Sequence, residues 1–406
     1  MPVGLTGLPL LHPVPGVRLG TTAAAIRKPN RRDLVVIECP SGAQCVATFT
    51  QNRFCAAPVT VAKRHLSRQT PRALLINTGF ANAGTGAPGI ADAEDCCAAL
   101  AKQIGCLPDE ILPFSTGVIG ERLPVARVVH GLAGALAALS DTGWPDAAHG
   151  IMTTDTVPKG SSRRISLGGR QVTVTGIAKG AGMIRPDMAT MLAFVATDAT
   201  VSREALQACV HAAVSQSFNR ITVDGDTSTN DSCVLVATGL SGAPLIGAPQ
   251  GSDYDLLLGA VTQTFQELAQ AIVRDAEGAT KFITIHVVGA ENEGDALAIA
   301  YTVAHSPLVK TAFFASDPNW GRILAAVGRA PIVRLDAERV TIHLDNVCVV
   351  RNGALAPDYT EAQGQAVMKS PEIRVTIGLN AGPAEATVWT SDLSHEYVSI
   401  NADYRS

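Results

Sequence analysis

The sequence KGAGMIRPDMATMLAFVAT, residues 179–197, joins a glycine-rich loop to a short apolar segment. Its first half holds two glycines and a proline, which predict a turn, whereas Met191 to Thr197 has the length and composition of a buried β-strand. Ala189 and Thr190 therefore stand where the loop opens into the strand. We expect a threonine at this position to be anchored by its strand and open on its N-terminal side.

Short runs rich in Val, Ile and Leu recur along the chain and alternate with longer segments of helical period, which is typical of an α/β fold. The predicted strands are Leu34–Ile37, Ala73–Ile76, Met191–Thr197, Cys233–Ala237, Lys281–Val288, Val340–Leu344, Ile373–Leu379 and Ala386–Thr390. Ser202 is placed to cap one helix, and Asp253 opens a second helix that we expect to end at Gly278.

A β-hairpin and a linker are also predicted. Two alternating segments, 164–167 and 171–175, are separated by Gly168-Gly169, which can take the positive φ angles of a two-residue hairpin turn. The best linker candidate is 241–251, because its Gly and Pro content is that of a surface loop.

The composition is that of a full-sized globular protein. With 406 residues and roughly 150 per domain, the chain has room for two or three domains. Apolar residues make up 47% of it and the net charge is only −4, which argues against intrinsic disorder. Charged residues make up 17%, against a usual value of about 25%, and no run of Lys or Arg exceeds a pair. We therefore expect no nucleic-acid partner.

Neither export nor membrane insertion is expected. The most apolar segments, such as 131–139 and 191–196, are far shorter than the roughly 20 residues that cross a bilayer. The N-terminal segment lacks a basic region, and early prolines interrupt any apolar helix. Nine cysteines occur without a C-x-x-C pair, which fits free and mostly buried thiols in a reducing compartment. The sequence therefore predicts a cytoplasmic protein.

Metal sites find little support in the sequence. The nine histidines form neither an HExxH nor an HxH pattern. The acidic segment DGDTSTND, residues 224–231, offers oxygen ligands without the EF-hand spacing. A self-capped turn after a strand explains this segment better, and we expect no metal ion.

Two further motifs belong to other enzyme classes. GTGAPG, residues 84–89, matches the G-x-G-x-x-G fingerprint of dinucleotide-binding folds, but it begins eight residues after the predicted strand ends at Ile76. Asp392, Ser394 and His395 are the residue types of a hydrolase triad, but they cluster on one terminal segment and no G-x-S-x-G elbow occurs. We interpret residues 84–89 as a glycine-rich loop beside a cleft. We interpret Asp392, Ser394 and His395 as a polar strand end.

Nucleophilic chemistry at Thr190 is the remaining candidate. Attack of its hydroxyl on the Ala189 carbonyl would cut the chain. The new α-amine, with a pKa of about 8, would then lie beside that hydroxyl and could act as its base. From these residues alone, an ordinary threonine at the start of a strand is the simpler alternative.

The motif around Thr190 closely resembles the cleavage and nucleophile motif of the ornithine acetyltransferase family, the bifunctional glutamate N-acetyltransferases of arginine biosynthesis. Further segments similar to that family follow in order over nearly the whole chain. They are NRFCAAPV from Asn52, LLINTGFANAGTG from Leu74, STGVIG from Ser115, IMTTDT from Ile151, ITVDGDTSTNDS from Ile221, RDAEGATKF from Arg274, KTAFFASDPNWGRI from Lys310, and the terminal SINADYRS. Long motifs at this density exclude mere similarity of fold.

The resemblance implies a nucleophile and a processed chain. Thr190 would be the nucleophile, freed by self-cleavage after Ala189. Cleavage would leave an α chain of residues 1–189 and a β chain of residues 190–406, which share one jointly folded core.

The resemblance also implies the remaining site residues. Thr116 and Gly117 match the oxyanion-hole pair of the family. The positions that match its substrate-contacting residues are Thr153, Lys179, Thr190, Glu277, Asn401 and Ser406. Glu277 is suited to accept from a substrate ammonium, whereas Lys179 is suited to hold a carboxylate.

The implied activity is acetyl transfer from N2-acetylornithine to L-glutamate, by a ping-pong route through an acetyl-threonine. No metal or bound cofactor is implied, and the use of acetyl-CoA as a second donor stays open. The implied fold is a layered αββα sandwich, as in N-terminal nucleophile aminopeptidases, with a second, smaller α/β domain. The implied assembly is an α2β2 heterotetramer. Two alternatives stay open: an amidase or peptidase using the same threonine, and an NAD(P)-dependent oxidoreductase built on residues 84–89.

Overall fold

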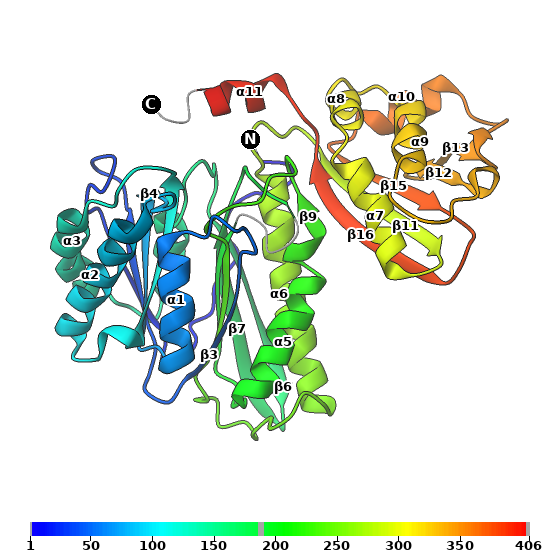
Figure 1. The fold of residues 1–406 in the computed structure, drawn as a ribbon. Helices are drawn as coiled ribbons and strands as arrows, with labels where there is room; N and C mark the ends of the chain where they lie inside the picture. The colour runs from blue at the N-terminus through cyan, green and yellow to red at the C-terminus, as the bar shows by residue number, and fades with distance from the viewer. Residues whose placement is uncertain (1, 186–190, 403–406) are drawn as a thin grey trace. The chain divides into compact units, whose positions relative to one another are not determined.

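The computed structural model describes residues 2–185 and 191–402, and the chain forms two compact units (Figure 1). The larger unit comprises Thr6–Asn219 and Asp226–Ile272, and the rest of the chain belongs to the smaller unit. The loop at 241–251, the predicted linker, lies inside the larger unit. It stays there because Ile246 pairs with Val201 as an isolated parallel bridge.

The larger unit contains two β-sheets. The four-stranded sheet has the order β1 (Arg18–Thr22), β2 (Leu34–Glu38), β4 (Ala73–Phe80), β5 (Ile111–Val118). The five-stranded sheet has the order β3 (Gln44–Phe49), β10 (Ser232–Ala237), β8 (Leu192–Thr197), β7 (Arg170–Lys179), β6 (Lys159–Leu167). Because β4 and β5 run parallel, their carboxyl ends lie at the same edge.

The two sheets pack face to face around one apolar core. Ile76 of β4 and Phe114 of β5 share this core with Phe194 of β8 and Val234 of β10. The rings of Phe114 and Phe194 meet edge to face, with centroids 5.1 Å apart, a favoured aromatic geometry.

Helices cover the two outer faces. Helices α2 (Gly86–Ile104) and α3 (Val125–Ala137) bury Leu100 and Leu132 against Val36 of the four-stranded sheet. Helices α5 (Arg203–Ser215) and α6 (Ser252–Arg274) lie along the five-stranded sheet (Figure 1). The layers are therefore helix, sheet, sheet, helix, and the predicted αββα sandwich is confirmed. The connections also include α1 (Ala57–Arg68) and α4 (Trp144–Gly150).

The smaller unit is a second α/β fold, as predicted. Its sheet has the order β14 (Ala354–Leu355), β13 (Val347–Arg351), β12 (Thr341–Leu344), β15 (Glu372–Gly378), β11 (Phe282–Ala290), β16 (Ala384–Ser391), β9 (Ile221–Thr222). The helices described in this unit are α7 (Glu293–Ala304), α8 (Pro307–Phe314), α9 (Trp320–Gly328), α10 (Glu361–Met368) and α11 (His395–Ala402). Ile285 and Val375 form the middle of its core with Ile299 of α7.

All eight strands predicted from apolar runs are present, and the hairpin is confirmed. β6 and β7 pair as far as Leu167 opposite Arg170, with Gly168 and Gly169 at φ +53° and +76°. Ser202 caps α5, because its Oγ accepts from the Ala205 amide at 3.1 Å.

The predicted end of the second helix at Gly278 is wrong. α6 ends at Arg274, and the next residues form separate turns in which the Ala276 amide donates to Val273 and the Ala279 amide to Ala276. Gly278 has φ +68°, outside the right-handed helical region.

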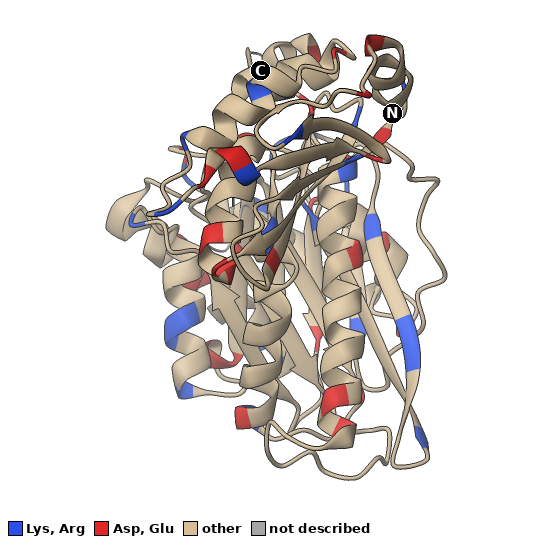
Figure 2. Cartoon of the chain, turned by 90° about the vertical axis from the view of Figure 1, so that its right-hand side faces the viewer, with Lys and Arg blue, Asp and Glu red and all other residues tan. Residues whose placement is uncertain are grey.

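Surface charge and thiols agree with the sequence. Basic and acidic residues are interspersed along the ribbon rather than separated by sign (Figure 2). All nine cysteines are free, and burial raises the pKa of Cys39 and Cys96 to about 12, so these thiols stay protonated. Among the residues described, no helix is both long and apolar enough to span a bilayer.

Candidate active site

Thr116 and Gly117 lie at the carboxyl end of β5 in the larger unit. Gly117 has φ +137°, and a Cβ there would lie 2.3 Å from the carbonyl carbon of Gly79 on β4. A side chain therefore cannot be accommodated at this position. Thr116 beside it is 9% exposed. The predicted oxyanion-hole pair thus stands at the edge of the parallel strand pair, the usual ligand edge of such strands.

Lys179, the last residue of β7, reaches Thr116 from the facing sheet. Its Nζ donates to Thr116 Oγ1 at 3.3 Å, and only 5% of the lysine is exposed. An ammonium can donate but not accept, so the hydroxyl proton of Thr116 stays available for another acceptor. The structure therefore brings together two residues predicted to act on the substrate.

A buried carboxylate, Asp155, organises the backbone next to Lys179. Asp155 Oδ1 accepts from Lys159 Nζ at 2.6 Å and from the Gly180 amide at 2.7 Å, and Oδ2 accepts from the Thr153 amide at 2.9 Å. Burial alone would raise the pKa of Asp155, but the charges of Lys159 and Lys179 and these hydrogen bonds hold it well below its ordinary value. Asp155 thus fixes the predicted substrate residue Thr153 relative to the loop that begins at Gly180.

Asn230 joins the two sheets at this edge. It lies just before β10, is 7% exposed, and its Nδ2 donates to Ala81 O at 2.7 Å and to Ser115 O at 2.9 Å. Ala81 directly follows β4, and Ser115 directly precedes Thr116 in β5. Asn230 therefore holds the ends of both strands in place. Sequence reasoning missed this residue because it treated residues 224–231 as a self-capped turn.

Asp231 supports the start of β8. Its Oδ1 accepts from the Met191 amide at 3.0 Å, and Oδ2 has no hydrogen-bond partner within residues 2–185 and 191–402. Burial raises the pKa of Asp231 well above its ordinary value, although the Met191 amide, the nearby Ser228 hydroxyl and the charge of Lys179 oppose the shift. Asp231 was also missed; its signal was an acidic residue directly before an apolar strand.

Glu277 and Asn401 contact each other in the smaller unit. Asn401 Nδ2 donates to Glu277 Oε2 at 2.8 Å and to the Tyr397 carbonyl at 2.9 Å within α11. Glu277 is 8% exposed and lies in the turn after α6. The structure thus pairs these two predicted substrate residues with each other.

Three predicted residues lie outside the described part of the chain: Ala189, Thr190 and Ser406. The others divide between the two units, with Thr116, Gly117, Thr153 and Lys179 in the larger and Glu277 and Asn401 in the smaller.

The glycine-rich motif at 84–89 serves local packing. Asn82 Nδ2 donates to the Gly89 carbonyl at 2.8 Å, and Thr85 Oγ1 donates to Asn82 Oδ1 at 2.8 Å. A Cβ on Gly89 would lie 1.9 Å from Thr85 Oγ1. The motif therefore closes on its own residues at the start of α2, which accounts for Gly89 without a dinucleotide.

Asp392, Ser394 and His395 have separate partners. Asp392 Oδ1 accepts from the Thr280 amide at 2.8 Å, Ser394 Oγ donates to Gly278 O at 2.7 Å, and the His395 ring lies edge-on to Phe314. These contacts secure the segment that precedes α11. In the described ranges, no group of three or more His, Cys, Asp or Glu side chains is arranged to hold a metal ion.

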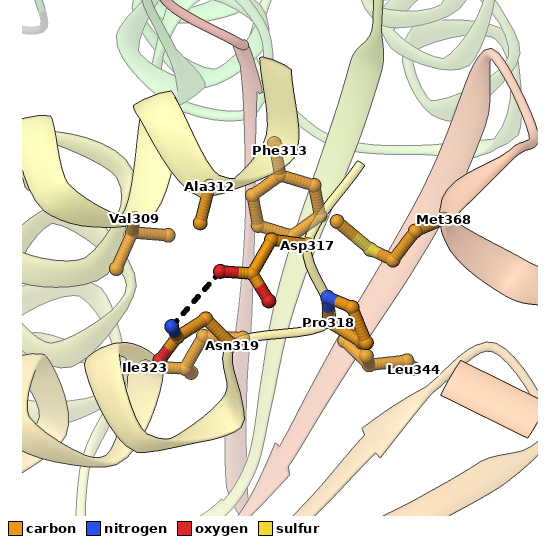
Figure 3. A pocket seen from close by; sticks show the side chains of 9 residues that line it. All are labelled: Val309, Ala312, Phe313, Asp317, Pro318, Asn319, Ile323, Leu344 and Met368. Carbon is orange, nitrogen blue, oxygen red and sulfur yellow. Dashed lines mark hydrogen bonds between the residues drawn. The ribbon is translucent and has the colours of Figure 1, made fainter. Parts of the chain in front are cut away.

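A small hollow in the smaller unit belongs to the motif that starts at Lys310 (Figure 3). Asp317 and Asn319 face each other across it, with Asn319 Nδ2 donating to Asp317 Oδ2 at 3.0 Å. Asn319 Oδ1 also accepts from the Arg322 amide and caps α9. Apolar side chains fill the remaining space, which leaves no room for a water molecule. The motif is thus explained by helix capping and packing.

The family and the curated relatives that this chain resembles match it over nearly its whole length. The sequence profile of the ArgJ family matches residues 18–406. The arginine biosynthesis bifunctional protein ArgJ of Pseudomonas fluorescens (strain Pf0-1) is 55% identical over 406 residues, which is 100% of both chains. That of Methylococcus capsulatus is 58% identical over 396 residues, 98% of this chain and 97% of the relative. The arginine biosynthesis bifunctional protein ArgJ of Bacillus halodurans has a crystal structure, and the chain in it is 35% identical in sequence. The match covers 50% of this chain and 95% of that chain, with a TM-score of 0.49.

Proposed function

The chain belongs to the ArgJ family of bifunctional arginine-biosynthesis enzymes, and from this premise we propose that it transfers the acetyl group of N2-acetylornithine to L-glutamate. It is an acyltransferase, as the sequence predicted. The products of the proposed reaction are ornithine and N-acetylglutamate.

The proposed reaction begins with cleavage of the chain. The Thr190 hydroxyl attacks the Ala189 carbonyl, the peptide nitrogen leaves as the new α-amine of Thr190, and water hydrolyses the resulting ester. Two chains, 1–189 and 190–406, then remain associated. The free amine lies next to the Thr190 hydroxyl and serves as its base.

Acetyl transfer then proceeds in two balanced steps. Thr190 Oγ attacks the acetyl carbonyl of N2-acetylornithine, the C–N bond breaks, and ornithine leaves with the proton that Oγ gave up. The amine of glutamate attacks the acetyl-threonine ester, and Oγ recovers a proton as N-acetylglutamate leaves. Thr116 and the Gly117 amide are proposed to stabilise the oxyanion in both steps.

The observation that carries this proposal is the position of Lys179 between Thr116 and the start of β8. Lys179 donates to Thr116 Oγ1 and is the strand partner of Leu192, two residues after Thr190 in sequence. The chain that bears the proposed nucleophile therefore enters its strand beside the proposed oxyanion hole. Glu277 and Asn401 are proposed as substrate contacts, together with Thr153 and Ser406.

Three finer features belong to the same proposal. The word bifunctional in the names of the relatives supports acetyl-CoA as a second acetyl donor for glutamate. Nine free cysteines support a reducing cytoplasm. The assembly is proposed to be an α2β2 heterotetramer that needs no bound cofactor or metal.

Intact mass and N-terminal sequencing test the cleavage. Wild-type protein is expected to yield a chain that starts Thr-Met-Leu-Ala-Phe, and Thr190→Ala is expected to remain one chain of 42.1 kDa without acetyltransferase activity. Cleavage at the same bond in Thr190→Ala would contradict the assignment. Measuring N-acetylglutamate against free acetate separates transfer from hydrolysis, and an excess of acetate would favour the amidase alternative.

A further inference from the structure

A basic hollow lies beside the ends of β2 and β4 in the larger unit. It is formed by Arg27, Lys28 and Arg31 from the loop after β1, together with Asp33, Thr78 and Gly79, and its cavity volume is about 40 Å³. This is far below the range of roughly 300–1,000 Å³ for pockets that enclose a whole small-molecule ligand. The hollow therefore suits one charged group of a ligand.

The loop that carries the three cations is built onto Asp33. Its two carboxylate oxygens accept from the Ala24 amide at 2.7 Å and the Ile26 amide at 2.6 Å. The Asp33 carboxylate is thus hydrogen-bonded to backbone amides, and Arg27 forms an ion pair with Glu121 at 3.3 Å. Lys28 is exposed and has no hydrogen bond or ion pair within the described residues, so the hollow keeps a net positive charge.

The hollow adjoins the proposed oxyanion hole through β4. Gly79 leaves room for Arg27, because a Cβ on Gly79 would lie 2.7 Å from Arg27 Cβ. In the parallel β4–β5 pair, Gly79 stands opposite Gly117 and Thr78 opposite Thr116. The floor of the hollow is therefore one strand spacing, about 5 Å, from the proposed oxyanion-hole backbone.

A second contact leads from the hollow to a proposed substrate residue. One guanidinium nitrogen of Arg31 donates to the Met152 carbonyl at 2.5 Å and to the Thr153 carbonyl at 3.1 Å. The same cationic loop thus supports the backbone of Thr153.

We propose that this hollow binds the side-chain carboxylate of the acceptor amino acid. The inference rests on the proposed function, in which donor and acceptor differ in the charge of their side chains. The side chain of ornithine carries an ammonium and that of glutamate a carboxylate, so a cationic hollow attracts the side chain of the acceptor and repels that of the donor. The carboxylate of glutamate lies a few covalent bonds from the amine that is acetylated, which fits a hollow one strand away. The phosphates of acetyl-CoA fit this short distance less well, because they lie at the far end of a long pantetheine arm.

Removal of the Lys28 charge tests the proposal. In Lys28→Gln we expect the KM for glutamate to rise roughly threefold to tenfold, since a charge-assisted contact is lost at a solvent-screened site. Lys28→Glu is expected to raise this KM further. Lys28→Arg keeps the positive charge, so its KM for glutamate is expected to be close to that of wild type. The rate of enzyme acetylation by N2-acetylornithine, measured without acceptor, is expected to change far less. Lys102→Gln, which removes another exposed lysine charge on α2, serves as the matched control with an unchanged KM.

Acceptor selectivity gives an independent readout. Glutamine lacks the side-chain charge, so the preference of Lys28→Gln for glutamate over glutamine should fall by the same factor as its affinity for glutamate. An unchanged KM for glutamate in Lys28→Gln and Lys28→Glu would overturn the proposal. A rise confined to the KM for acetyl-CoA would overturn it too, by assigning the hollow to phosphate.

Calorimetric titration with glutamate separates this proposal from the proposed reaction. Weaker binding to Lys28→Glu than to wild type would uphold the hollow even if glutamate were not acetylated. Equal binding to both proteins would refute the hollow while leaving the acetyl-transfer assay to judge the reaction.

Discussion

Replacing Asp155 by Asn should destabilise the larger unit strongly. In the wild type, Asp155 Oδ1 lies 2.6 Å from Lys159 Nζ, and neither side chain is exposed to solvent. At an effective dielectric constant of about 20, two unit charges at that distance attract by about 6 kcal/mol, and removing one partner of a buried pair costs about 3–5 kcal/mol once desolvation is included. The Asn amide would also point a donor at Lys159, Gly180 or Thr153, all of which already donate.

Urea denaturation of the uncleaved Thr190→Ala protein measures this loss without complications from separated chains. The sequence has three tryptophans, and replacing Trp320 and Trp389 by Phe leaves Trp144, which is 1% exposed in the larger unit, as the fluorescent reporter. Asp146→Asn is the matched control, because its ion pair with Arg32 is exposed. We expect that control to lose less than about 1 kcal/mol.

A double-mutant cycle identifies the cause. Lys159→Met should cost less than Asp155→Asn, because Asp155 keeps the two backbone amides and the charge of Lys179. The loss in free energy of unfolding of the double variant should be smaller than the sum of the two single losses by about 1–3 kcal/mol. Because the folded pKa of Asp155 is depressed, the stabilisation is present above the unfolded pKa of about 3.9 and is lost only as the pH falls through the folded value. A cost below about 1 kcal/mol near neutral pH, or strict additivity, would refute the reasoning.

Two further predictions concern Thr116 and Asp231. Thr116→Val keeps the shape but removes the hydroxyl, so kcat for acetyl transfer should fall by about 10²–10³-fold in a chromatographic assay; retention of most of the wild-type kcat would count against the oxyanion role. Burial raises the pKa of Asp231, so above the unfolded value near 3.9 the folded state keeps a proton that the unfolded state releases, and the stability of the wild type falls as the pH rises. The free energy of unfolding of Asp231→Asn should therefore improve relative to wild type as the pH rises from about 4 to 7, and a difference independent of pH would contradict this.

The fold was predictable where a strand is a continuous apolar run. β5 was missed because it reads ILPFSTGV, in which Pro113 and the polar Ser115 and Thr116 interrupt the pattern. The proline is tolerated because β5 is an edge strand, where a missing N–H removes no ladder bond on the open side. The end of α6 was misplaced because Gly278 was taken as the first breaker, whereas the helix ends at Arg274.

The candidate site was predictable only through motif resemblance. Asp155 and Lys159 stand four residues apart, a spacing that suggests a helical pair, yet they lie in a loop and at the start of β6. Asn230 contacts carbonyls more than 100 residues away in sequence, which no local pattern records. The basic hollow likewise depends on Gly79 being opposite Gly117, a register fixed by tertiary pairing.

The order of the five-stranded sheet determines how a cleaved protein could be made. β8 and β10 follow the proposed cut, and they are flanked by β3 on one side and by β7 and β6 on the other, all of which precede it. Neither piece alone can complete the sheet, and each would expose unpaired strand edges that promote aggregation. The uncut precursor would therefore act as its own assembly scaffold and fix a one-to-one stoichiometry. Two separately synthesised halves are expected to aggregate before they meet.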